Sequence, residues 1–376
     1  MPRLDLRLHE SNHGNGSSNG GGGGSGPAVW LRALQALRTL EWLRLSWGQV
    51  PKAAWPLLTG VQGLRCLAID RCAHLTDAAL GALGALPHLT ALSLAHCELV
   101  TTAGLRTLAG HSARRSAPLV ELQLAHCGGI RSVPPPLSVT LERLALVRQA
   151  AATVAGFFAV SKAAAAVTAP DAAWPRLRHL VLDKVTRAAE ELPALNRLRL
   201  PTTLRTLAWT HTSWRQNAVG PLEPLPLVLP ELWALDLSGS LFGRVAWTSV
   251  LLPALAAHLR WLDCSMTDFN DVADLGVGAR CATPNLETLL LRNGAVSGGP
   301  AEAAALRTLP SLGLLDVRGC PLTEPLRLAL ALQPGVRVVW QDHEDLDEDN
   351  DPDASLRRRP HQPRAHTWQE IAGFLL

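Results

Sequence analysis

The chain has 376 residues, of which 47% are hydrophobic and 18% are charged, and its formal net charge is only +3. A charge this small gives no electrostatic argument for nucleic acid or a membrane as the partner. The first residues, MPRLDLRLHE, lack the apolar core of a secretion signal, and no run approaches the roughly 18 apolar residues of a membrane span, so we expect a soluble cytoplasmic protein.

The N-terminal segment combines one candidate strand with a flexible stretch. Leu4, Leu6 and Leu8 alternate with charged residues, which favours the strand of a partial repeat at 3–9. Residues 11–26 are almost entirely Gly, Ser and Asn, a composition that cannot repay its ordering entropy. We therefore assign residues 1–29 to a disordered, Gly/Ser-rich N-terminal segment that includes this candidate strand.

Between residues 64 and 108 the same pattern occurs twice. Its key positions are Leu64, Leu67, Ile69 and Cys72, which recur as Leu89, Leu92, Leu94 and Cys97. The spacing L-x-x-L-x-L-x-x-C predicts a short strand with inward apolar side chains, followed by a turn and a helical return. One such unit buries its apolar edge only against a neighbour, so the pattern predicts a stack of repeats.

The second leucine of each strand serves as an anchor that can be followed along the chain. The anchors are Leu43, Leu67, Leu92, Leu122, Leu144, Leu180, Leu207, Leu235, Leu262, Leu289 and Leu315, with a degenerate twelfth at Val338. They predict a repeat domain at 30–340 with about 11–12 repeats, interrupted by an Ala-rich insertion near 150–173. The Pro-rich segments 132–136 and 221–230 are expected to form no regular helix. Residues 341–376 read as an acidic and then basic disordered tail that ends in a short helix.

The segment from Cys72 to Leu80, CAHLTDAAL, resembles the cysteine-containing leucine-rich repeat of the ribonuclease-inhibitor-like subfamily, as found in F-box substrate receptors of ubiquitin ligases. Its second copy departs from the family pattern by Thr102, where the family has Asp. The resemblance implies a curved α/β leucine-rich repeat solenoid, with parallel strands on the concave face, helices and irregular segments on the convex side, and other proteins as partners. The apolar F-box module itself is not recognisable, because a glycine-rich stretch occupies its place.

The sequence offers no sign of enzymatic chemistry. No nucleophile, base and orienting residue converge in a recognisable motif, and no C-x-x-C or H-E-x-x-H spacing indicates a metal, so we predict no catalytic, cofactor or metal site. The chain has seven cysteines, and Cys72, Cys97 and Cys127 share one repeat position. They are predicted to be reduced, buried thiols that hydrogen-bond the loop backbone.

Candidate binding residues lie at outward positions of the aligned repeats. The second residue after the last inward strand position is basic or histidine in six successive repeats: Arg71, His96, His126, Arg148, Lys184 and His211. Stacked strands lie about 4.8 Å apart, so these residues are predicted to form a ridge along the rim of the inner face, unless the column is only a soluble edge. Imidazoles titrate near pH ~6.5, so the charge of the ridge is expected to rise as the pH falls.

Acidic and aromatic residues complete the predicted surface. The acidic candidates are Asp236, Asp263 and Asp316, and the exposed aromatic candidates are Trp42, Trp47 and Trp261. A tryptophan at the end of a solenoid can equally cap the core. A bipolar concave face of this kind would orient a protein partner that carries an acidic surface.

From these features we predict a monomeric, non-enzymatic scaffold or adaptor that binds another protein on the concave face, without nucleic acid or membrane as a partner. One alternative is the substrate receptor of an SCF-type ubiquitin ligase without a recognisable F-box. Another is an enzyme regulator of the ribonuclease-inhibitor type. Nuclear, cytoskeletal or ciliary association remain alternatives to a purely cytoplasmic location.

Overall fold

The structure is a computed structural model that describes residues 2–7, 39–46, 50, 52–111, 116–158, 173–185, 200–212, 229–241, 258–269, 283–296, 300–331 and 335–340. The chain divides between Thr203 and Leu204 into two compact units. The predicted flexible stretch at 11–26 and the predicted tail at 341–376 lie outside the described residues.

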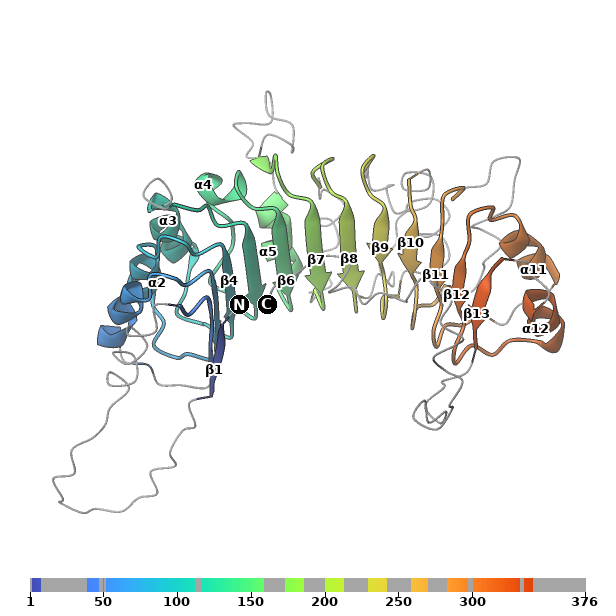
Figure 1. Cartoon of the computed structure of the whole chain (residues 1–376), viewed down its shortest axis with the longest axis horizontal. Helices are drawn as coiled ribbons and strands as arrows, with labels where there is room; N and C mark the ends of the chain where they lie inside the picture. Colours follow the sequence, from blue (N-terminus) through green and yellow to red (C-terminus); the bar gives the residue numbers. More distant parts are fainter. Residues whose placement is uncertain are drawn as a thin grey trace, which may run out of the picture. The chain divides into compact units, whose positions relative to one another are not determined.

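The first unit contains seven strands that pair in parallel and in chain order (Figure 1). They are β1 (Arg3–Arg7), β2 (Trp42–Ser46), β3 (Cys66–Asp70), β4 (Ala91–Ala95), β5 (Glu121–Ala125), β6 (Arg143–Val147) and β7 (His179–Asp183). In this sheet Leu43 is paired with Leu67, Leu67 with Leu92, and so on to Leu180, so each predicted anchor faces the next. The strand predicted from Leu4 and Leu6 is present as β1, and Leu4 is in register with Leu43.

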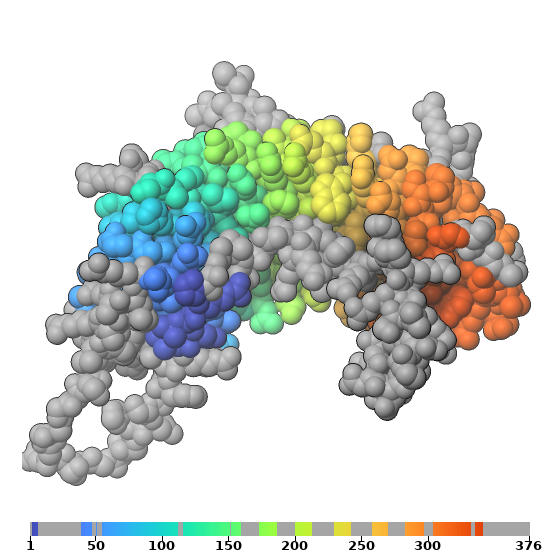
Figure 2. All heavy atoms as spheres, viewed as in Figure 1, coloured from blue at the N-terminus to red at the C-terminus, as the bar shows by residue number. Residues whose placement is uncertain are grey.

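The second unit repeats this arrangement with six strands, of which all but the first are shorter than those of the first unit. They are β8 (Thr206–Thr210), β9 (Ala234–Asp236), β10 (Trp261–Asp263), β11 (Thr288–Leu290), β12 (Leu314–Asp316) and β13 (Arg337–Val339). The anchors Leu207 to Leu315 are again in register, and Val338 pairs with Leu315. Within each unit the colours in Figure 2 follow one another in sequence order, as expected when each repeat packs on its neighbours.

Helical segments return the chain from one strand to the next. They are η1 (Lys52–Gly60), α2 (Asp77–Leu83), α3 (Thr102–Gly110), α4 (Pro135–Ser138), α5 (Ala151–Phe158), α11 (Pro300–Arg307) and α12 (Glu324–Ala331). Helix α2 begins where the Thr76 hydroxyl accepts a hydrogen bond from the N–H of Ala79. The expectation that segment 132–136 forms no helix is wrong for the last residues of this segment, because Pro135 begins the single-turn helix α4. Proline is tolerated at the first position of a helix, since the backbone N–H of that position has no acceptor within the helix. None of the helices in the described ranges is both long and apolar enough to span a membrane.

The anchor leucines form the core, and Leu67, Leu92 and Leu122 are completely buried. Most of the predicted insertion near 150–173 lies outside the described residues, but its first part forms α5. The buried ring of Phe158 in this helix lies 5.5 Å from the ring of Trp174, so α5 packs on the flank of the first unit.

A ladder of polar side chains connects successive repeats beneath the strand ends. Its donors, which occupy the predicted cysteine position, are Cys97, Cys127, Gln149, Ser240 and Cys320. Each donates to a backbone carbonyl of the preceding repeat: Cys127 Sγ lies 3.4 Å from the Leu94 oxygen, and Ser240 Oγ lies 2.8 Å from the Trp209 oxygen. The predicted thiol–backbone hydrogen bonds are present, but the acceptors are carbonyls of strand residues and not of the loop. The six cysteines of the described part are free thiols.

Candidate protein-binding surface

The residues of the predicted ridge share an unusual backbone conformation. All eight non-glycine residues with positive φ in the described part of the chain lie at this repeat position: Arg71, His96, His126, Arg148, Lys184, His211, Met266 and Asn293, with φ between 50° and 55°. Gly239 and Gly319 continue the column with φ of 67° and 69°. We call this column the αL edge. The left-handed region costs an L residue about 1 to 2 kcal/mol, whereas glycine adopts it freely.

The αL edge is held in place by the backbone of the neighbouring repeat. The N–H of His96 donates to the carbonyl of Ala125 at 2.9 Å, and the N–H of Arg148 donates to the carbonyl of Asp183 at 2.7 Å. These bonds extend the sheet by one rung beyond the last strand residue. They direct the side chains of successive repeats to the same edge, with Arg71 to Lys184 in the first unit and His211 to Gly319 in the second.

Three side chains of the αL edge contact one another in the first unit. The rings of His96 and His126 are stacked with centroids 4.2 Å apart, and Arg148 Nη1 lies 3.3 Å from His126 Nε2. Because a guanidinium can only donate, Nε2 of His126 acts as the acceptor, so this imidazole is neutral and carries its proton on Nδ1.

His126 gains its charge at a lower pH than the sequence-based expectation for the ridge assumes. Burial, followed by the neighbouring His96, Arg148 and Arg71, lowers the pKa of His126 below its ordinary value. Cationic neighbours and partial desolvation both disfavour the imidazolium. The sequence pattern treats each imidazole as isolated, whereas stacking in adjacent repeats places His126 between two other cationic or protonatable groups.

The acidic candidates of the second unit are more enclosed than the sequence predicts. Asp236 is buried, and its Oδ1 accepts a hydrogen bond from the N–H of Ser238 at 2.9 Å. Asp263, which is in register with Asp236, accepts in the same way from the N–H of Ser265. Burial, together with the charge of Asp263, raises the pKa of Asp236 to about 6, and burial also raises the pKa of Asp263.

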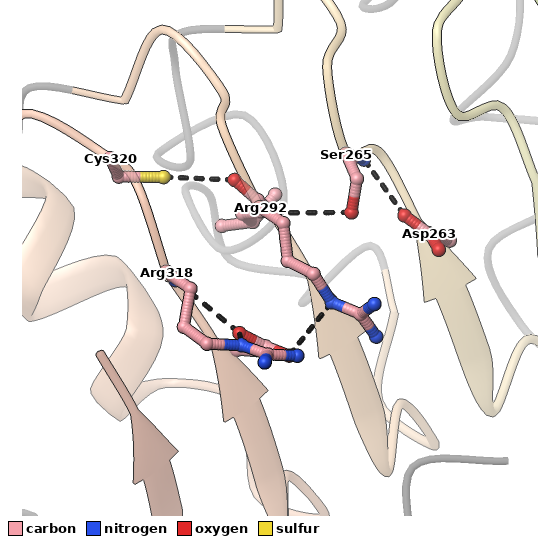
Figure 3. A network of polar contacts seen from close by, with 7 residues as sticks. Asp263, Ser265, Arg292, Arg318 and Cys320 are labelled. Atoms are coloured by element: carbon pink, nitrogen blue, oxygen red, sulfur yellow. Dashed lines mark hydrogen bonds and ion pairs between the residues drawn. The ribbon is translucent and has the colours of Figure 1, made fainter. Parts of the chain in front are cut away.

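Asp316 forms ion pairs with Arg292 and Arg318. Figure 3 labels these two arginines in the network. Its carboxylate is 2% exposed and accepts from Arg292 Nε at 2.8 Å and from Arg318 Nη2 at 2.9 Å. Burial alone would raise the pKa of Asp316, but the hydrogen bonds from Arg318 and the charge of Arg292 outweigh it and hold this pKa below its usual range. The expectation that Asp236 and Asp316 are available to a partner is therefore wrong for this structure, because neighbouring side chains enclose both.

The tryptophan candidates differ in their placement. Trp42 is half-buried, and the guanidinium carbon of Arg3 lies 5.9 Å from its ring centroid. Trp261 is only 6% exposed and packs in a buried cluster with Ala234 and Leu290, so the prediction that it is exposed is wrong. The alternation of the strand gives its face correctly, but neighbouring side chains on that face cover the indole. Trp47 lies outside the described residues.

Register, inward leucines and the polar side-chain ladder together decide the fold. The chain is a leucine-rich repeat solenoid. No protein-family model matches the sequence of this solenoid, and no curated protein matches it. The ribonuclease-inhibitor-like subfamily stays a prediction.

Several solved structures are similar to the solenoid. TLR13 in complex with ssRNA13 is 18% identical, with 84% of this chain and 40% of that chain covered and a TM-score of 0.49. Mouse RP105 in complex with MD-1 is 13% identical, with coverages of 83% and 49% and a TM-score of 0.47. A leucine-rich repeat protein of Leptospira interrogans is 17% identical, with 90% of both chains covered and a TM-score of 0.31. The solenoid spans less than half the length of the first two chains.

The solenoid also brings together residues that the repeat pattern does not reveal. A cleft of about 780 Å³ at the αL edge is lined by His96, His126 and Arg148 together with Glu98 and Arg131. Glu98 and Arg131 occupy loop positions that neighbouring repeats fill with other residue types, such as Ala73 and Thr101, so no periodic signal identifies them. Within the described residues, no group of three or more metal-ligating side chains could hold an ion.

Proposed function

We propose that this leucine-rich repeat solenoid is a non-enzymatic scaffold or adaptor that binds another protein at the αL edge of the first unit and the adjoining strand face. The main observation in support is the type of residue found at the αL edge. In five successive repeats of the first unit a strained position holds Arg, His or Lys, where glycine would relieve the strain. Strain of this kind tends to be retained where the side chain has a use.

The adjoining strand face supports the same proposal. Several of its side chains next to the αL edge are small, namely Ala68, Ser93, Ala95 and Ala125, with the longer Gln123 beside Ser93. Small side chains leave room for a partner to approach the strands closely. The longer cationic side chains beside them then contribute to orientation and to the association rate more than to buried area.

Glycine substitution along the αL edge tests this proposal directly. Replacing Arg71, His96, His126, Arg148 and Lys184 by Gly removes the side chains and also relieves the backbone, so unfolding free energy should rise by about 0.5 to 1 kcal/mol per site. The variant should nevertheless lose the partner that the wild-type chain captures from lysate, measured by quantitative mass spectrometry and then with the purified partner by calorimetry. Met266→Gly, at the same repeat position in the second unit, is the matched control and should keep the partner.

A glycine variant that still captures the partner with unchanged affinity would refute the proposal. The identity of the captured protein separates the finer alternatives. Ligase core subunits would indicate a substrate receptor, and a single nuclease or phosphatase would indicate an enzyme regulator.

A further inference from the structure

The cleft at the αL edge lies where β4, β5 and β6 end, and the first turns of α5 form its other side. Its volume of about 780 Å³ is within the range of sites that hold a small ligand or several side chains of a peptide. The lining includes two arginines, Arg131 and Arg148, and two histidines, His96 and His126.

The charge in the cleft is unbalanced. Among the described residues neither Arg131 nor Arg148 has a carboxylate within ion-pair distance, and both are exposed. Glu98 is the acidic residue of the lining. With neutral imidazoles, two arginines and one glutamate leave a formal charge of +1 in the cleft.

Arg148 is held at its guanidinium, and Arg131 is held at its backbone, before any ligand arrives. Arg148 Nη1 donates to His126 Nε2 at 3.3 Å, and His126 is itself stacked on His96. The N–H of Arg131 donates to the Thr102 hydroxyl at 2.9 Å, and a Cβ on Gly156 of α5 would lie 2.9 Å from the Arg131 carbonyl. The loop and helix α5 therefore pack closely around the Arg131 backbone. Such preorganisation reduces the conformational entropy that is lost when a ligand binds.

We propose that this cleft binds the carboxylate of an acidic side chain in an extended segment of the protein partner, with Arg131 and Arg148 as the donors. The inference rests on the proposed function, since it names the chemistry of the partner at one place on the same surface. Guanidinium groups suit this role because their planar donors match the two oxygens of a carboxylate. Glu98 opposes an anion in the cleft, so it favours ligands that satisfy both arginines at once.

The test uses the full chain and a fluorescently labelled oligoglutamate peptide, with affinity measured by fluorescence anisotropy at low salt. Arg131→Gln with Arg148→Gln should weaken binding at least about tenfold, because two charge-assisted hydrogen-bonding groups are lost. Glu98→Gln should strengthen binding by a few fold, since it removes the opposing charge. Arg106→Gln, an exposed arginine on α3 outside the cleft, is the matched control and should leave the affinity unchanged.

Several outcomes would overturn the inference. They are absence of peptide binding by the wild type at low salt, equal affinity of wild type and the double variant, and a loss in Arg106→Gln as large as in the double variant. A single-stranded oligonucleotide of equal charge that binds more tightly through the same two arginines would also overturn it. Failure of the carboxylate site can be distinguished from failure of the proposed function. If the double variant keeps the lysate partner that the five-glycine variant loses, the proposed scaffold function is supported and the carboxylate site is refuted.

Discussion

Asp236 makes the stability of the second unit depend on pH in a direction opposite to that of most carboxylates. Its side chain is 7% exposed, and burial, followed by the charge of Asp263, raises its pKa to about 6. A folded-state pKa above the ordinary value of 3.8 means that the folded chain binds the proton more tightly than the unfolded chain. The contribution of Asp236 to stability is therefore fully present below pH ~3.8 and is lost as the pH rises through about 6.

The size of this loss follows from the shift in pKa. A shift of about two units corresponds to roughly 3 kcal/mol at pH ~7.5, of which roughly 1 kcal/mol is already lost at pH ~4.5. Asp236→Asn keeps an oxygen that can accept from the N–H of Ser238 but removes the titration. The unfolding free energy of this variant relative to wild type should therefore increase by about 2 kcal/mol between pH ~4.5 and pH ~7.5.

Urea unfolding of both proteins at the two pH values, followed by circular dichroism, measures this difference. Asp5→Asn is the matched control, because Asp5 occupies the same outward position in β1 but is exposed. Relative to wild type, the control should gain no comparable stability between the two pH values, because it keeps Asp236 and replaces an exposed side chain. If the advantage of Asp236→Asn were the same at both pH values, the burial of this carboxylate in the folded chain would be refuted.

Three further predictions concern stability. Leu92→Ala removes a completely buried anchor and should lower the unfolding free energy by about 2 to 5 kcal/mol in thermal melts, whereas Leu99→Ala, at a position 52% exposed, should be nearly neutral. Gly239→Ala should cost about 1 to 3 kcal/mol, because φ is 67° and the new Cβ would lie 2.6 Å from the His211 ring; Gly128→Ala, with free space, serves as its control. Arg318→Gln should lower stability by about 1 to 3 kcal/mol near neutral pH, less than for a fully buried pair because Arg318 is partly exposed, and this loss should shrink in acid as Asp316 becomes protonated.

The repeat register was predictable because it depends on a period that the sequence displays directly. Each anchor from Leu43 to Val338 lies in a strand, and Cys72, Cys97 and Cys127 at the predicted cysteine position are buried thiols. Leucines at a fixed spacing favour one low-energy arrangement of the chain, in which every repeat covers the apolar edge of the preceding repeat.

The left-handed conformation of the αL edge was partly visible in the sequence. Gly239, Asn293 and Gly319 stand in the same column as the basic residues, and these residue types adopt positive φ more readily than others. Arg71, Arg148 and Lys184 carry no such signal, so the conformation can be inferred for them only through the alignment of the column.

The depth of burial and the cleft could not be read from the pattern. Alternation assigns Asp236 and Trp261 to the outer face, but it does not tell how far neighbouring side chains enclose them. Arg131 and Arg148 line the same cleft because the loop after β5 and helix α5 lie beside the ends of neighbouring strands. Such a meeting depends on three-dimensional packing between segments that do not repeat.

The side-chain ladder gives the stack a polarity. The donor always belongs to a later repeat and the acceptor to an earlier one, as between Cys127 and Leu94 or between Ser240 and Trp209. Excision of one whole repeat between equivalent positions would therefore rejoin a donor to an equivalent carbonyl, whereas a cut within a repeat would leave both groups without their partners. Repeats can therefore be removed or transplanted only as complete units. Each transplanted repeat must keep its direction, with its side-chain donor facing the carbonyl of the preceding repeat.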